Sequence, residues 1–288
     1  MHTFSSYFQH INTSTQRPIN IMPALQNSVL GLLASRCRIS RSCVCVCVTL
    51  CVCRPGEKIG VVGRTGAGKS TLIIAMFRLS ELDEGSVTID GIRHNSLALQ
   101  QLRSKIAIIP QEPVMFKGTL RSNLDPFHNY TDAQLIEVLK KCLLHSLVDQ
   151  HSKDMGLSKE VEVFGVNFSL GQQQLICLAR AMLTPSKILL LDEATASLDS
   201  DTDAMVQKVL RTNFNERTIM TIAHRLDTII DSDRILAMDK GIVAEFDSPK
   251  TLLANPKSIF SELCRNAGPD EYKRLYSAAM SAEGYHQR

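Results

Sequence analysis

One octapeptide constrains the fold of this chain more than any other feature. Residues 63–70 read GRTGAGKS, which fits the pattern G-x-x-x-x-G-K-[ST]. An apolar run at 58–62 precedes the loop, and a mostly apolar stretch at 69–79 follows it. A strand, a glycine-rich turn and a helix in this order let backbone N–H groups and a positive helix N-terminus face phosphate oxygens. We therefore expect an α/β fold built around a nucleotide-phosphate site.

The chemistry of such loops assigns a role to their polar side chains. Lys69 is expected to reach the β- and γ-phosphates of the nucleotide, and the Ser70 hydroxyl is expected to bind Mg²⁺. ATP and Mg²⁺ are therefore the predicted cofactors. The other nucleotide-binding candidates are the rest of the loop and the residue after it, namely Gly63, Arg64, Thr65, Gly66, Ala67, Gly68 and Thr71.

A second apolar run, at 188–191, ends in two carboxylates, Asp192 and Glu193. An acid fixed at the end of a strand can complete a Mg²⁺ shell, which is the role expected for Asp192. Glu193 is expected to orient and polarise the attacking water. Two acids after a strand are common in proteins, so their meaning depends on the phosphate-binding loop upstream.

Apolar runs and helical segments alternate along the rest of the chain. Between about 112 and 160 we see no strand pattern, and Thr131 and Gln134 form a capping-box pair ahead of apolar residues at helical spacing. This alternation predicts a mostly parallel sheet covered by helices, with a helical insertion at about 118–183. Further strands are expected at about 87–90, 105–109, 187–192, 218–222, 234–238 and 242–246.

The first 53 residues differ from the rest in composition. They hold four Arg, no Lys and no acid, and residues 43–53 read CVCVCVTLCVC. A strand or a metal site is conceivable, but no His lies nearby and there is no CxxC pair. A translated TG-dinucleotide repeat also encodes Cys-Val alternation, and the acid-free leader resembles a transit peptide in composition. We expect residues 1–53 to be an atypical, disordered leader outside the folded core.

Charge and hydropathy argue against two classes of function. The chain has 32 Lys and Arg against 29 Asp and Glu, a net charge of +3, which is too weak to indicate a nucleic-acid partner. No apolar run reaches the roughly 18 to 20 residues that cross a bilayer, so we do not expect this chain alone to do so. Three widely spaced cysteines after residue 53, at 142, 177 and 264, favour a reduced, intracellular domain over a disulfide framework.

A third motif narrows the class of nucleotide-binding protein. Residues 168–172 read FSLGQ and lead into an apolar helical stripe. This segment resembles the LSGGQ signature of ATP-binding-cassette (ABC) proteins, with Ser169, Gly171 and Gln172 matching and Phe168 and Leu170 departing from it. In that family the signature grips the γ-phosphate bound to the opposite subunit, which is again an anion at a helix N-terminus. The simpler interpretation is a helix that begins at a serine N-cap.

The order of the remaining motifs resembles the same family. Gln111, after the strand expected at 105–109, resembles the Q-loop glutamine, which contacts Mg²⁺ and senses the transport domains. Asp199 in the SLD sequence at 197–199 resembles the D-loop, and His224 resembles the H-loop histidine that contacts the γ-phosphate. The resemblance thus implies Lys69, Glu193 and His224 as catalytic residues, Ser70, Gln111 and Asp192 as Mg²⁺ ligands, and signature contacts from 169–172.

Longer stretches resemble one subfamily. RPGEKIGVVGRTGAGKS, IIPQEPVMFKGTLRSNLDPF and TIAHRLDTIIDSDRI are similar to the second nucleotide-binding domain of multidrug-resistance-associated (subfamily C) transporters. The resemblance runs from about 54 to 263 and leaves a polar tail at 264–288. It implies a small antiparallel β part, here truncated at the N-terminus. The aromatic residue that stacks on adenine in this family is missing, and such stacking is worth roughly 1–3 kcal/mol.

The resemblance implies an ATPase that powers substrate export at the cytoplasmic face of a membrane, as part of an integral membrane transporter. Its partners would be a second ABC nucleotide-binding domain, in a nucleotide-sandwich dimer, and transmembrane domains absent from this chain. A nucleotide-sensing regulator of the channel type and a non-functional fragment are the alternatives, and Glu193 argues against a purely binding role. A soluble DNA-repair ATPase would need a long coiled coil, for which the 100 residues between Lys69 and Ser169 leave no room.

Overall fold

The computed structural model describes residues 30–33, 51–82, 85–147, 156–223 and 225–281. Its centre is a six-stranded sheet with the order β12-β11-β3-β10-β9-β6. All neighbouring pairs are parallel except β11 with β12, which confirms the mostly parallel sheet. The strands are β3 (Lys58–Gly63), β6 (Ile106–Ile109), β9 (Ile188–Asp192), β10 (Thr218–Ile222), β11 (Arg234–Asp239) and β12 (Ile242–Asp247).

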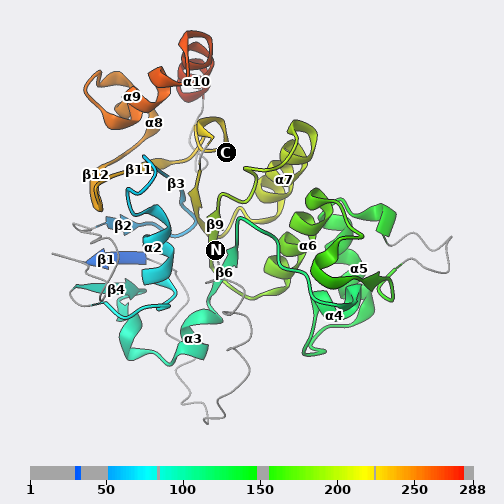
Figure 1. The fold of residues 1–288 in the computed structure, drawn as a ribbon. Coiled ribbons are helices and arrows are strands. Elements are labelled where there is room, and N and C mark those ends of the chain that lie inside the picture. Colours follow the sequence, from blue (N-terminus) through cyan, green and yellow to red (C-terminus); the bar gives the residue numbers. More distant parts are fainter. Residues whose placement is uncertain (1–29, 34–50, 83–84, 148–155, 224, 282–288) are drawn as a thin grey trace.

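The central strands are apolar throughout because both faces of the sheet are covered. Every residue of β9 is buried, as expected for a parallel strand between two layers. Its side chains alternate: Leu190 joins the core that packs against α2 (Lys69–Met76), whereas Leu189 and Leu191 join the core under α6 (Leu170–Leu183) and α7 (Ser200–Asn213). Figure 1 shows α2 on one side of the strands and α6 with α7 on the other.

A second sheet corrects the expectation for the front end. Its order is β2-β1-β4-β5, all antiparallel. In β2, Cys51 and Cys53 are buried in the core and Val52 is exposed. Alternation with a period of two is what a half-buried strand requires, whatever the origin of the codons. The boundary at residue 53 is therefore wrong for the described part, whose strands are β1 (Leu30–Leu33), β2 (Cys51–Cys53), β4 (Ser86–Ile89) and β5 (Ile92–Arg93). The rest of 1–50 lies outside the described residues.

Deleting residues 1–53 is expected to lower the melting temperature by about 5 °C or more. The deletion removes Cys51 and Cys53 from the core and the Val52 carbonyl that accepts a 2.8 Å hydrogen bond from Arg234. Thermal unfolding followed by circular dichroism measures the effect, with a deletion of residues 1–29 as the control that keeps every described strand. Equal melting temperatures for the full chain and the 1–53 deletion would contradict this role of β2.

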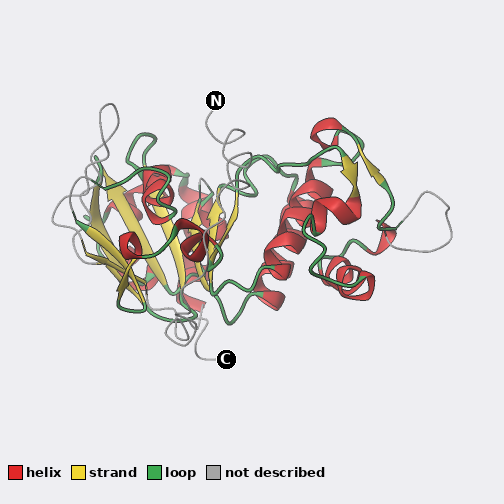
Figure 2. Cartoon of the chain, turned by 90° about the horizontal axis from the view of Figure 1, so that it is seen from below, coloured by secondary structure: helices red, strands yellow, loops and turns green. Residues whose placement is uncertain are grey.

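The helical subdomain projects from one edge of the central sheet, at the right of Figure 1 and on the right in Figure 2. The capping box expected at Thr131 and Gln134 is confirmed, since each residue's side chain bonds the other's backbone N–H. A two-stranded ribbon, too short to leave a pattern in the sequence, was not expected. The elements are β7 (Gly118–Thr119), α4 (Leu120–Leu124), α5 (Asp132–Lys141), β8 (Glu160–Val161) and α6.

The C-terminal segment is structured well past residue 263, which corrects the expected boundary. Phe260, Cys264, Leu275 and Ala279 are buried in one cluster with residues of β3 and β11. These four buried residues are divided between two helices and separated by polar residues, so the sequence of the tail is polar overall. The helices are α8 (Pro249–Ala254), α9 (Ile259–Asn266) and α10 (Pro269–Ser281).

No helix within the described ranges has the length and apolar content needed to span a bilayer.

The other elements are short. The short elements are α3 (Leu99–Arg103) and 3₁₀ turns at His94–Ser96, His145–Leu147, Val163–Gly165 and Leu226–Thr228.

Candidate nucleotide site

The loop between β3 and α2 is shaped by its glycines. Gly68 has φ +98° and is the N-cap of α2, with no side chain capping the helix. The first N–H groups of α2 are thus left for another acceptor, as in an anion site. Gly63 is needed for a close approach, because a Cβ there would lie 2.4 Å from the carbonyl oxygen of Met238.

Lys69 lies at the start of α2 and is folded back over the loop. Its side chain is buried, and Nζ donates to the carbonyl oxygens of Gly63 (2.9 Å) and Arg64 (3.4 Å). Burial lowers the pKa of Lys69, and the negative charges of Glu193 and Asp192 oppose that shift. The structure therefore brings the predicted lysine and both predicted acids into one electrostatic neighbourhood. Ser70, next in the helix, is exposed at its N-terminus.

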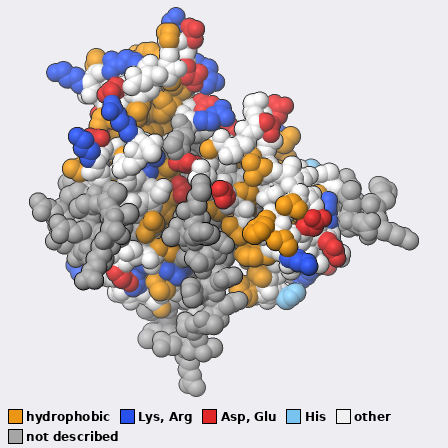
Figure 3. Space-filling model, viewed as in Figure 1, with side chains coloured by type: hydrophobic (Ala, Val, Ile, Leu, Met, Phe, Trp, Pro, Cys, Tyr) orange, Lys and Arg blue, Asp and Glu red, His pale blue; other side chains and the backbone are white. Residues whose placement is uncertain are grey.

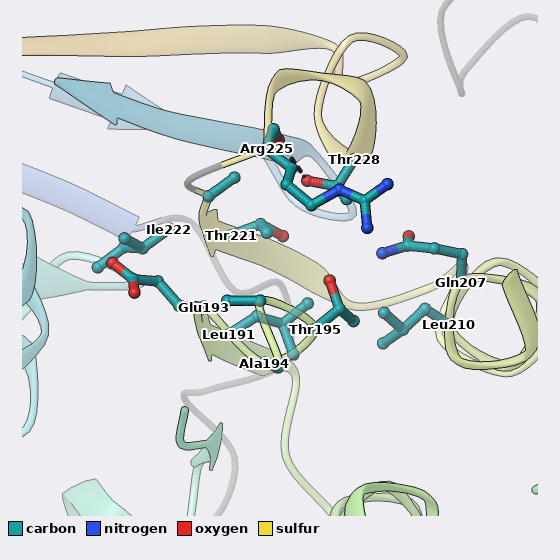
Figure 4. Close-up of a pocket in the computed structure, with 12 residues that line it drawn as sticks. Leu191, Glu193, Ala194, Thr195, Gln207, Leu210, Thr221, Ile222, Arg225 and Thr228 are labelled. Atoms are coloured by element: carbon teal, nitrogen blue, oxygen red, sulfur yellow. Dashed lines mark hydrogen bonds between the residues drawn. The ribbon is translucent and has the colours of Figure 1, made fainter. Parts of the chain in front are cut away.

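The two acids sit where β9 ends. Asp192 is the last residue of the strand and is only 8% exposed. Glu193 has φ +49°, a left-handed conformation that is rare outside glycine, so the chain turns sharply there. Its backbone N–H donates to the Ile222 carbonyl (3.0 Å), which ties the turn to the end of β10. Figure 4 shows the Glu193 carboxylate turned away from the small cavity that Thr195 and Gln207 line.

Gln111 is exposed just beyond β6. A nearby residue that the sequence analysis did not single out, Gln174, binds the chain before Gln111 and the chain after Glu193. Gln174 of α6 is buried, and its Nε2 donates to the carbonyls of Pro110 (3.3 Å) and Ala194 (2.5 Å). One amide thus fixes the segment that leads to Gln111 and the turn that carries Glu193. Nothing in the run of three glutamines at 172–174 indicates which of them has this role.

Arg180, also unpredicted, fastens the same helix to the segment after Gln111. Its guanidinium donates to the carbonyls of Val114 (2.5 Å) and Asn123 (2.6 Å) and to Oδ1 of Asn123 (2.8 Å). Burial lowers the pKa of Arg180, and hydrogen bonds to three oxygens compensate for the loss of solvent. The segment 112–123 and α6 are therefore joined by buried polar contacts.

The signature segment forms the start of α6. Ser169 caps the helix: its Oγ accepts the Gln172 N–H (3.2 Å), and the Gln172 side chain accepts the Ser169 N–H (3.1 Å). The serine N-cap of the simpler interpretation is therefore present. Ser169 and Leu170 are exposed, whereas Gly171 is buried. An action of these residues on a partner's phosphate stays a prediction.

Asp199 caps α7, and its Oδ1 accepts the Thr202 N–H (3.0 Å). Hydrogen bonds from the backbone and hydroxyl of Thr202 lower the pKa of Asp199, so this exposed carboxylate is held ionised. His224 lies outside the described residues. The chain on its far side is anchored, because Arg225 pairs with Asp203 of α7 (3.2 Å) and with Asp227 (2.8 Å).

Comparison with known proteins agrees with this geometry. Residues 49–196, which are 148 of 288, match the ABC transporter family. The chain is 54% identical over 215 residues to the metal resistance protein YCF1 of Saccharomyces cerevisiae, an alignment that covers 75% of this chain and 14% of that protein. It is 49% identical over 213 residues to ATP-binding cassette sub-family C member 3 of Homo sapiens, covering 74% of this chain and 14% of the relative.

The fold also matches a solved transporter. A bacterial Atm1-family ABC exporter with ATP bound has a TM-score of 0.77 and 28% identity, over 92% of this chain and 47% of that chain. This chain thus corresponds to about a seventh of the length of the curated relatives named above. The phosphate-binding loop, the two acids, the signature helix and the fold all agree with these matches. The chain therefore belongs to the ABC transporter family and contains the ATP-binding domain of a transporter related to subfamily C.

Proposed function

We propose that this domain binds and hydrolyses ATP to power substrate export by a subfamily C-like transporter. One observation carries the proposal. Lys69 is buried at the uncapped N-terminus of α2 and interacts electrostatically with Asp192 and Glu193 at the end of β9. A lysine and two acids near an uncapped helix N-terminus are the groups that a nucleotide phosphate with its Mg²⁺ requires. The names of the two relatives, a metal resistance protein and an ATP-binding cassette sub-family C member, are consistent with a transport role.

Lys69, Glu193 and His224 have distinct parts in the proposed reaction. The loop N–H groups and Lys69 bind the phosphates and stabilise the charge that develops on the transferred group. To do so Lys69 exchanges its hydrogen bonds to Gly63 and Arg64 for phosphate oxygens. Glu193 accepts a proton from the attacking water and orients it in line with the bond to be broken. His224 is proposed as a further contact to the γ-phosphate.

The proposed Mg²⁺ ligands are chemically suited to that ion. Ser70, Gln111 and Asp192 offer a hydroxyl, an amide and a carboxylate oxygen, the hard donors that Mg²⁺ prefers. Ser70 and Gln111 are exposed, so both can turn toward a bound nucleotide, while Asp192 is fixed by its strand. When bound, Mg²⁺ neutralises charge on the β- and γ-phosphates.

A second nucleotide-binding domain is the proposed partner across the nucleotide. Ser169 at the start of α6 and Asp199 at the start of α7 are both exposed. The N-terminus of α6, whose cap is an uncharged serine, suits the phosphate of a nucleotide held by the loop of another domain, and α7 begins beside it. ATP in this arrangement is sandwiched between two domains, and hydrolysis requires the dimer.

Transmembrane domains are the second proposed partner, which places the domain at the cytoplasmic face of a membrane. Figure 3 shows hydrophobic side chains gathered over the helical subdomain. The loops that carry them adjoin, since a Cβ on Gly165 would lie 2.7 Å from Met115. An exposed apolar patch of this kind indicates a protein interface. Its members are Phe116, Val163, Phe164 and Val166, exposed by 46, 52, 75 and 69%.

Replacing the strand-end acid tests the proposal. Asp192→Asn is expected to weaken Mg²⁺-dependent ATP binding by roughly ten- to hundred-fold, because a neutral amide is a poorer ligand for a divalent cation. Calorimetric titration with ATP, in Mg²⁺ and in EDTA, measures the dependence. Asp247→Asn is the matched control, because Asp247 also ends a strand but lies at the sheet edge. The same Mg²⁺ dependence in the parent and Asp192→Asn would refute the site.

A further inference from the structure

The N-termini of α6 and α7 meet at a glycine. A Cβ placed on Gly171, the second residue of α6, would lie 2.2 Å from Cγ2 of Thr202, the third residue of α7. It would also lie 3.2 Å from Oγ1 and 3.3 Å from Cβ of the same threonine. Because packed atoms do not approach to 2.2 Å, only glycine fits opposite Thr202 without a shift of one helix.

Thr202 contacts the second helix terminus at the same time. Its backbone N–H donates to Oδ1 of Asp199 (3.0 Å), and its hydroxyl also bonds the Asp199 side chain. A β-branched side chain in a helix has few χ1 choices, so the methyl and the hydroxyl are held in their places. One residue therefore packs on the signature helix and supports the cap of α7.

We propose that Thr202 is a positioning residue that fixes the signature segment, 169–172, against the Asp199 cap, so that both helix N-termini move as one body. The functional consequence rests on the proposed sandwich dimer, in which the signature segment faces a partner's nucleotide. The contact itself, within one chain, does not depend on that proposal.

Two reasons for a glycine at 171 can be separated by experiment. If the position must be small only because a partner's phosphate approaches the backbone there, a side chain at 171 is harmful whatever stands at 202. If the position must be small because α7 packs on it, shortening residue 202 makes room. Residue 202 therefore discriminates between a nucleotide contact and a contact between the helices.

The experiment uses the full chain with Glu193→Gln, to retain ATP, and has two readouts. Melting temperature without nucleotide reports the packing, and sedimentation with saturating ATP and Mg²⁺ reports the affinity of the dimer. Gly171→Ala is expected to lower the melting temperature and to weaken the dimer by about tenfold or more. Adding Thr202→Ala removes the atoms 2.2 and 3.2 Å away and leaves the new Cβ at position 171 in contact with Cβ of residue 202, 3.3 Å away, so the two helices keep their contact. The double replacement is therefore expected to restore the melting temperature and to bring the dimer affinity to within about threefold of the parent.

Two further replacements separate the methyl from the hydroxyl. Thr202→Ser removes Cγ2 and keeps the hydroxyl for Asp199, so it is expected to rescue Gly171→Ala in part. Thr202→Val keeps the branched bulk, so it is expected to give no rescue. Thr212→Ala is the matched control, because Thr212 is an exposed threonine near the other end of α7 whose hydroxyl donates to the Lys208 carbonyl, and it should rescue nothing. ATP affinity of the chain's own loop should stay unchanged throughout.

The outcomes assign failure to one proposal or the other. A melting temperature that Thr202→Ala does not restore would overturn the packing contact. A restored melting temperature with an unrestored dimer would overturn the positioning role and favour the phosphate contact. If the Glu193→Gln parent dimerises with ATP neither with itself nor with another nucleotide-binding domain, the sandwich dimer is wrong for this chain, and the melting temperatures still decide the contact.

Discussion

Glu193→Gln is expected to retain bound ATP and to lose hydrolysis by roughly 10²- to 10⁴-fold. The glutamine has the size of the glutamate and needs no different backbone, so the left-handed turn at φ +49° is kept. It cannot take a proton from the attacking water. The lysine and the phosphate-binding loop are untouched, which is why binding should survive while the chemical step fails.

Phosphate release under single-turnover conditions measures this effect. A filter-binding assay run in parallel shows whether ATP stays on the protein. Glu216→Gln, which changes an exposed acid in the turn before β10, is the matched control and should hydrolyse ATP at the parent rate. A Glu193→Gln protein that hydrolyses ATP as fast as the parent would show that another group activates the water.

Lys69→Ala is expected to abolish detectable ATP binding while leaving the fold intact. The variant removes the charge that faces the phosphates, and hydrogen bonds to charged groups are worth about 1.5–3 kcal/mol each. Because burial already disfavours the charged lysine, as its lowered pKa shows, its loss should not lower the melting temperature. If the replacement instead unfolded the domain, the Lys69→Ala protein would lose both ATP binding and its melting transition.

Titration with a fluorescent ATP analogue, together with thermal unfolding, tests this. Lys208→Ala, on the exposed side of α7, is the control for loss of a lysine. Parent-like affinity in the Lys69→Ala protein would refute the assignment of the loop.

Features encoded in neighbouring residues could be predicted from the sequence. The loop at 63–70, the apolar run before Asp192 and the capping box at Thr131 each depend on a few adjacent residues and fixed periodicities. The parallel sheet followed from their alternation with helices. The motif order led to the family, which the comparisons then confirmed.

Features made by distant residues could not be predicted. Gln174 contacts Pro110 across 64 positions, and Arg180 contacts Val114 across 66, and no local pattern distinguishes them from other polar helix residues. The buried cysteines of β2 were misjudged for the same reason. Their strand is defined by its pairing with β1, and β1 has only four residues.

Gln174 and Arg180 join α6 to two segments that flank the candidate site. Gln174 fixes it at the ends of β6 and β9, and Arg180 grips the segment that follows Gln111. At 1.5 Å per residue, Arg180 lies about 9 Å along the axis from Gln174 on one side, and Ser169 lies about 7.5 Å away on the other. One rigid helix thus links the segment around Val114 to the signature segment, and a displacement of that segment is expected to change the position of Ser169, about 16 Å away along the helix axis.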